Sequence, residues 1–246
     1  MKNKPFIVNF HEHHMDENAD FTVLLSVGKE ELEKNKMIHQ ENPDKTAPFF
    51  WINMENDMDY ELRHLKNDVK NWGVKGIKFH PMLQHVYPND PRLNRIYEYC
   101  EEEGIIVLWH AGIVNLPFNY QLSGPLKVKY TDPVYIEDVA YDFPDMKIVI
   151  AHLGGNYIYT ASILALKHRN VYTDTAYLGF FGPRLFPKTT PSQMITHAVN
   201  VAGEDKVLYG GEGVTIQDVL DCDISDTAKE KVLGLNAMKL LEIPSK

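Results

Sequence analysis

Two histidines near the amino terminus are separated by one residue, in the segment His11-Glu12-His13. Side chains two residues apart in an extended strand point to the same face, so both imidazoles could bind one metal ion while Glu12 points away. His110 and Glu212 follow other apolar runs and could add a third imidazole and a carboxylate. Three imidazoles and one carboxylate suit one divalent ion, zinc in the first place or manganese, with a position left open for water.

Such an ion would lower the pKa of its water toward about 7 and supply a nucleophile at neutral pH. His152, in the run AHLGG, could polarise a substrate carbonyl or shuttle a proton. Glu212 could take a proton from the attacking water. We therefore predict His152 and Glu212 as catalytic residues.

Lys78 and His80 share one face of an apolar run, and we expect both to bind substrate. A lysine one layer deeper in a barrel than His80 needs a partner. The alternatives are Asp174, Glu212, an anionic substrate, or carbamylation of Lys78 to bridge two metals. Asp174, in the run YTDT, either orients a ligand imidazole or caps its strand, and we favour the first role.

Short apolar runs predict eight strands that would position these residues. They lie at 6–10, 21–26, 49–53, 74–79, 105–110, 148–152, 171–174 and 207–209. Several are apolar on both faces, as in IIVLW at 105–109, which suits parallel strands covered on both sides. Helical patterns lie between or after them at 57–72, 91–103, 132–143, 156–168, 192–202 and 225–241.

Eight strands alternating with helices in 246 residues predict an α/β fold, one (β/α)8 TIM barrel that forms a single domain over 1–246. The barrel could be distorted. Only residues 15–20 separate the first two strands, and a small, open pocket could be the consequence. An open doubly wound sheet is the alternative, but it should carry a glycine-rich phosphate turn after its first strand, and the sequence has none. The longest connection, 113–133, follows a strand and is expected to be functional.

Active sites of such barrels lie at the carboxyl ends of the strands. Six of the 11 histidines fall there in this assignment: His11, His13, His14, His80, His110 and His152. Aromatic residues near the same rim could line an apolar pocket: Trp109, Phe118, Tyr120, Tyr177, Phe180 and Phe181.

Charge and composition restrict the classes of binding partner and the expected localisation. The formal net charge of −9 argues against nucleic acid, and the apolar runs fall far short of the roughly 20 residues of a membrane span. The amino terminus lacks a secretory apolar segment, and Cys100 and Cys222 form no redox or metal motif. We expect a cytoplasmic protein that acts on a small molecule, with a homodimer as the default assembly.

Five segments recur in a characteristic order: HEH at 11–13, GIKFHP at 76–81, WHAG at 109–112, AHLGG at 151–155 and LYGGE at 208–212. Together they resemble the amidohydrolase superfamily, in its amidohydrolase-related branch of metal-dependent TIM-barrel hydrolases, which also contains aminocarboxymuconate-semialdehyde decarboxylase and related aromatic-acid decarboxylases. The resemblance spans nearly the whole chain. It implies a divalent metal, usually zinc, held by His11, His13 and His110, with His152 as the catalytic histidine.

The chain departs from this family at two positions. Asn9 stands where the family has aspartate, and Gly210-Gly211-Glu212 stands where it has Gly-Ser-Asp. That last aspartate binds the metal and activates water in the family. Replacing Glu212 by aspartate should therefore raise activity if the chain is a weakened member, and should abolish it if the site is built around the longer side chain.

Three functions follow as hypotheses. The first is a metal-dependent hydrolase that acts on a C–N or C–O bond, in an amide, lactone or ester, of a small carboxylate-bearing substrate. The second is a non-oxidative decarboxylase of a small aromatic or unsaturated acid on the same metal site. The third is a catalytically degenerate barrel that binds without turnover.

Overall fold

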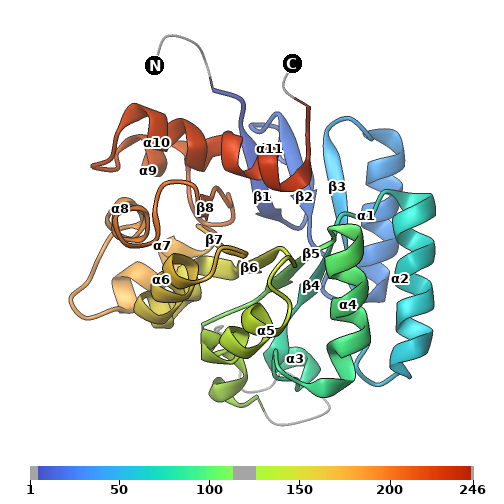
Figure 1. Cartoon of the computed structure of the whole chain (residues 1–246). Coiled ribbons are helices and arrows are strands. Elements are labelled where there is room, and N and C mark those ends of the chain that lie inside the picture. Colours follow the sequence, from blue (N-terminus) through green and yellow to red (C-terminus); the bar gives the residue numbers. More distant parts are fainter. Residues whose placement is uncertain (1–4, 113–125, 245–246) are drawn as a thin grey trace.

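The computed structural model describes residues 5–112 and 126–244, in which eight parallel strands form one sheet in sequence order, each paired with the next. They are β1 (Val8–Glu12), β2 (Phe21–Leu24), β3 (Thr46–Trp51), β4 (Gly76–Phe79), β5 (Ile106–Trp109), β6 (Ile148–Ile150), β7 (Val171–Asp174) and β8 (Val207–Leu208). The N–H of Phe10 donates to the carbonyl of Tyr209 at 2.7 Å, so the chain after β8 returns to β1. The sheet is nearly closed (Figure 1), which confirms the predicted TIM barrel.

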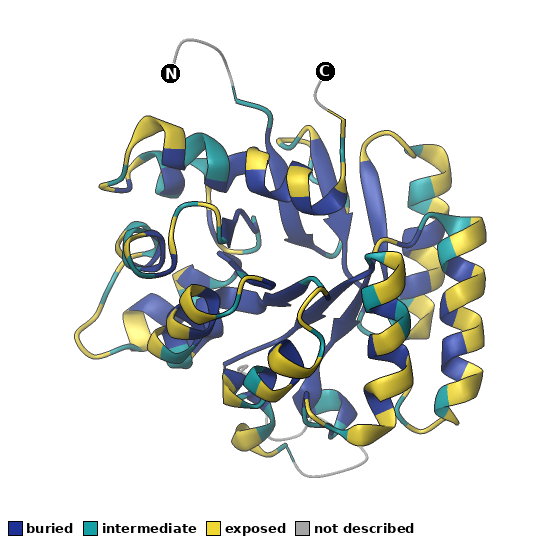
Figure 2. Ribbon diagram, in the orientation of Figure 1, coloured by how far each residue is buried: buried dark blue, intermediate teal, exposed yellow. Residues whose placement is uncertain are grey.

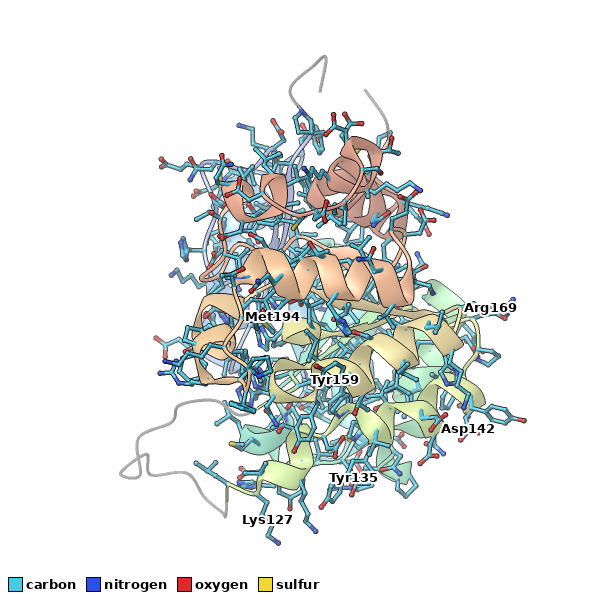
Figure 3. The ribbon with its side chains drawn as sticks, turned by 90° about the vertical axis from the view of Figure 1, so that its left-hand side faces the viewer. Lys127, Tyr135, Asp142, Tyr159, Arg169 and Met194 are labelled. Atoms are coloured by element: carbon cyan, nitrogen blue, oxygen red, sulfur yellow. The ribbon has the colours of Figure 1, made fainter. Side chains whose placement is uncertain are left out.

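Helices surround this sheet and turn their exposed faces outward, whereas the strands are buried (Figure 2). The longer helices are α1 (Lys29–Glu41), α2 (Met58–Trp72), α4 (Asn94–Glu103), α5 (Ile136–Asp142), α6 (Ile158–Lys167) and α8 (Pro191–Ala202). Shorter helices are α3 (Pro81–Gln84), α7 (Leu178–Phe181), α9 (Ile216–Leu220), α10 (Asp226–Glu230) and α11 (Asn236–Leu241). Tyr159 projects from the outer face of α6, which packs on β7 and α8 (Figure 3). No helix within the described ranges has both the length and the apolar character that a membrane crossing requires.

The connection between β1 and β2 contains no helix, so the first strand pair departs from the regular alternation of strand and helix. The carboxyl-terminal helical segment, ending in α11, packs against β1 (Figure 1). Gly234 makes this approach feasible, because a Cβ atom there would lie 1.9 Å from the carbonyl oxygen of Phe6. The end of the chain therefore supports the strand that carries the first histidine pair.

The predicted strand positions hold, with ends displaced by up to three residues; β1, for example, spans Val8–Glu12 and not 6–10. Helix α1 is absent from the sequence prediction. Its buried residues are Leu32, Asn35 and Lys36, so two of the three positions facing the core are polar. A search for apolar periodicity passes over such a helix.

A β-bulge interrupts β1, which has one more residue than β2 between two matched pairs. The ring of Phe10 lies 5.9 Å from that of Phe49, while Nε2 of His11 lies 3.2 Å from Nζ of Lys78. Phe49 and Lys78 face the barrel interior from neighbouring strands. The bulge thus lets two consecutive residues, one apolar and one imidazole, both reach the interior.

Candidate metal centre

The structure brings the predicted site residues together at the carboxyl ends of the strands. They are His11 in β1 and His13 just after it, Lys78 in β4 and His80 just after it, His110 after β5, His152 after β6, Asp174 in β7 and Glu212 after β8. The rings of His11 and His110 each have their centroid 4.7 Å from that of His152. The ring of His80 stacks on His110 at 4.1 Å.

Asp174 fixes the orientation of His11. Its Oδ2 atom lies 2.8 Å from Nδ1 of His11, and its Oδ1 atom accepts the backbone N–H groups of His152 and Ala176. A carboxylate only accepts, so Nδ1 of His11 carries the proton. Burial lowers the pKa of His11 well below its ordinary value, so the ring is neutral and Nε2 holds a lone pair.

Glu31 fixes the orientation of His13 as Asp174 fixes that of His11, and the sequence did not predict this role. Its Oε1 atom lies 3.0 Å from Nδ1 of His13, and its Oε2 atom accepts the N–H of Val27 at 2.5 Å. In the neutral ring this leaves Nε2 of His13 unprotonated. Glu31 lies in α1, and no local pattern connects it with a histidine 18 residues earlier.

Two carbonyl groups contact the rings of the next pair of histidines, His152 and His110. Nδ1 of His152 faces the carbonyl of Ala176 at 3.0 Å, and Nε2 of His110 faces the carbonyl of Gly112 at 3.1 Å. The remaining nitrogens, Nε2 of His152 and Nδ1 of His110, are 3.1 Å apart. A contact of this length is a hydrogen bond, which requires a proton on one of the two nitrogens. Burial lowers the pKa of both rings well below the ordinary value.

A left-handed turn places His152. The residues from His152 to Gly155 all have positive φ angles: 63°, 48°, 76° and 58°. Such angles cost energy in His152 and Leu153, which carry a Cβ, and they are typical of sites where geometry serves function. A Cβ atom on Gly155 would lie 2.6 Å from the ring of Phe181, so the two glycines of AHLGG are required by conformation and space.

Glu212 faces the same centre from the loop after β8. Its Oε2 atom is 3.8 Å from Nε2 of His11, and burial raises its pKa. Lys78 lies below, with 1% of its surface exposed and its Nζ near His11. Burial lowers the pKa of Lys78 to about 8, although Asp174 and Glu212 counteract the effect.

Among residues 5–112 and 126–244, two groups of side chains place one potential ligand atom each within 4.8 Å of one another: His11, His13 and Glu212, and His11, His152 and Asp174. Asp174 in the second group already accepts the His11 proton, so the first group is the better metal site. His110, predicted as the third imidazole ligand, belongs to neither group and faces His152 instead. Imidazole lone pairs with one carboxylate fit a borderline divalent ion.

Three of the six aromatic residues predicted at the rim lie near His152. Tyr177 and Phe181 have ring centroids 5.9 and 6.1 Å from that of His152, and Phe180 stacks on Tyr177 at 4.8 Å. Trp109 was predicted to line a pocket, but it is fully buried and stacks on Phe79 in the core. Phe118, Tyr120 and most of the connection 113–133 lie outside the described residues.

Comparison with known families agrees with this geometry. A family model described as amidohydrolase matches residues 35–243, so the chain belongs to that family, as the sequence motifs indicated. The match begins after β1 and therefore does not include His11 and His13. No curated protein matches the chain.

Solved structures share the fold over nearly the whole chain. An uncharacterised TIM-barrel protein from Bordetella bronchiseptica superposes with a TM-score of 0.73 at 22% identity, covering 91% of this chain and 78% of that one. A 5-carboxyvanillate decarboxylase from Novosphingobium aromaticivorans, complexed with manganese, superposes with a TM-score of 0.67 at 16% identity, covering 92% of this chain and 77% of that one. A 4-oxalomesaconate hydratase from Rhodopseudomonas palustris superposes with a TM-score of 0.68 at 19% identity, covering 92% of this chain and 77% of that one.

Proposed function

We propose that this chain is a metal-dependent hydrolase that cleaves a C–N or C–O bond of a small carboxylate-bearing substrate. One observation carries the proposal. His11 and His13 each have Nδ1 held by a carboxylate, Asp174 and Glu31, which leaves Nε2 to bind a metal ion. Each ring has a ligand atom within 4.8 Å of one of Glu212. Fixing the tautomer in this way is how proteins prepare imidazole to bind a metal ion.

The donor set suits zinc first and manganese second, held by His11, His13 and Glu212. When bound, such an ion supplies Lewis acidity and lowers the pKa of water at the site. Manganese has support from the decarboxylase of the same fold that was crystallised with it.

The remaining steps belong to residues of this chain. Burial raises the pKa of Glu212, which suits it to accept a proton. Glu212 takes a proton from water as the water oxygen attacks the carbonyl carbon, and then gives that proton to the leaving nitrogen or oxygen. His152 stabilises the developing negative charge or passes a proton. Lys78 and His80 hold the substrate, with the buried Lys78 ammonium pairing with the substrate carboxylate.

A non-oxidative decarboxylase is the second candidate. A decarboxylase and a hydratase are among the structures of similar fold. The same centre would hold the acid, and a proton would be delivered to the carbon that loses carbon dioxide. Release of carbon dioxide separates this reaction from hydrolysis.

Elemental analysis of protein purified without chelator tests the metal centre. We expect about one zinc or manganese ion per wild-type chain, and none in His11→Ala/His13→Ala. His64→Ala/His197→Ala removes two histidines outside the centre and is the matched control, expected to retain the metal. Absence of metal from the wild type, even after incubation with zinc and manganese chlorides, would overturn the proposal. A metal-loaded chain is then assayed on amide, lactone and ester carboxylates, with carbon dioxide release measured on aromatic acids.

A further inference from the structure

Asn9 joins three segments next to the metal centre. It is fully buried, and its Oδ1 atom accepts the N–H groups of Gly211, at 2.8 Å, and His11, at 3.2 Å. Its Nδ2 atom donates to Oδ2 of Asp16 at 2.9 Å. The amide therefore connects β1, the β1–β2 connection and the loop that carries Glu212.

The approach of this loop to Asn9 requires glycine at position 211. A Cβ atom on Gly211 would lie 2.4 Å from Nδ2 and 3.1 Å from Cγ of Asn9. Real Cβ contacts do not occur at the first distance, and the buried amide is held by its other partners. The glycine serves close packing of the loop on β1.

Further contacts hold the loop on both sides of Gly211. The N–H of Gly210 donates to Oγ1 of Thr175 at 3.0 Å, and the carbonyl of Glu212 accepts the N–H of Tyr177 at 2.5 Å. Together with the Gly211–Asn9 hydrogen bond, these contacts fix the main chain at Glu212. The position of that main chain, and the length of the side chain, decide how far the carboxylate reaches toward the histidines.

We infer that Asn9 is a positioning residue that sets the reach of the Glu212 carboxylate toward the metal. This inference rests on the proposed metal-dependent function. Aspartate at position 9 would place its carboxylate 2.9 Å from that of Asp16, so one of the two would have to be protonated. The amide of Asn9 donates to Oδ2 of Asp16, whose Oδ1 accepts from Asn18, while the amide oxygen of Asn9 holds Gly211.

A double-mutant cycle on the full chain tests this role. Binding of manganese and zinc chlorides is measured by calorimetry for the wild type, Asn9→Ala, Glu212→Ala and the double variant. We expect Asn9→Ala to weaken metal binding by roughly 10-fold, as removal of an outer hydrogen-bond partner does. In the Glu212→Ala background the same change should alter binding by less than about two-fold.

Asn236→Ala is the matched control, because Asn236 is also buried and bonds to the carbonyls of Glu204 and Val207 at the opposite end of β8. It should lower stability and leave metal affinity unchanged. If Asn9→Ala does not fold, Gly211→Ala disturbs the same contact from the other side. It is expected to weaken metal binding to a similar extent, again only when Glu212 is present.

Metal affinity of Asn9→Ala within two-fold of wild type would overturn the inference, as would an equal loss in both backgrounds. In either case the metal function stands, because the wild type still binds. A wild-type chain that binds neither ion overturns the proposed function as well.

Discussion

Shortening Glu212 to aspartate should remove the carboxylate from the metal site. Two atoms that each lie about 2.1 Å from one ion are at most about 4.2 Å apart. Oε2 of Glu212 is 3.8 Å from Nε2 of His11, which satisfies this limit. Loss of one C–C bond length, about 1.5 Å, extends the separation to as much as about 5.3 Å while the loop stays fixed.

We therefore expect Glu212→Asp to weaken manganese or zinc binding by at least about 100-fold, because loss of a ligand exceeds the effect of losing an outer partner. Calorimetric titration of the metal-free chain measures this, with the exposed Glu17→Asp as control. Affinity within two-fold of wild type would refute the reasoning. Tighter binding with higher activity would instead identify a weakened family member that aspartate restores.

Three further outcomes are expected. Glu31→Ala should weaken metal binding 10- to 100-fold in the same titration, whereas the exposed neighbour variant Glu30→Ala should not, and equal behaviour of the two would count against the carboxylate–imidazole pair. Burial lowers the pKa of His80 to about 3, below its unfolded value of about 6.5, so the unfolded state binds the proton first and stability falls as pH drops from about 6.5 toward 3. Urea unfolding of His80→Phe should show a shallower fall, by up to about 1.4 kcal/mol per pH unit, and an identical slope would contradict the assignment. Lys36→Met should lower the free energy of unfolding by about 3 kcal/mol, because it leaves Asp68 buried without its cation at 3.0 Å, and Asp68→Asn added to it should recover part of that loss.

The sequence alone determined the barrel and the list of groups that meet at its rim. Apolar runs mark the strands because a strand covered on both faces excludes polar residues, and their alternation with helices leaves few topologies open. In a parallel barrel every strand ends at the same face. Residues near strand ends, such as His11, Lys78 and His152, are therefore predicted to converge, even when no distances are known.

Tertiary structure decided which of these residues face one another. His110 was expected to complete the ligand set, and the structure turns it toward His152 because the carbonyl of Gly112 holds its other nitrogen. Helix α1, which places Glu31 behind His13, shows a polar buried face, so its existence depended on partners elsewhere in the chain.

The bulge in β1 and the role of Asn9 were likewise beyond sequence reasoning. Asn9 and Gly211 are 202 residues apart, and His11 and Asp174 are 163 apart. Hydrogen bonds between such residues depend on side-chain directions within a few tenths of an ångström, and these are set by packing of the closed barrel. Local patterns encode which face a residue occupies, whereas the partner on that face is known only once all eight strands are in register.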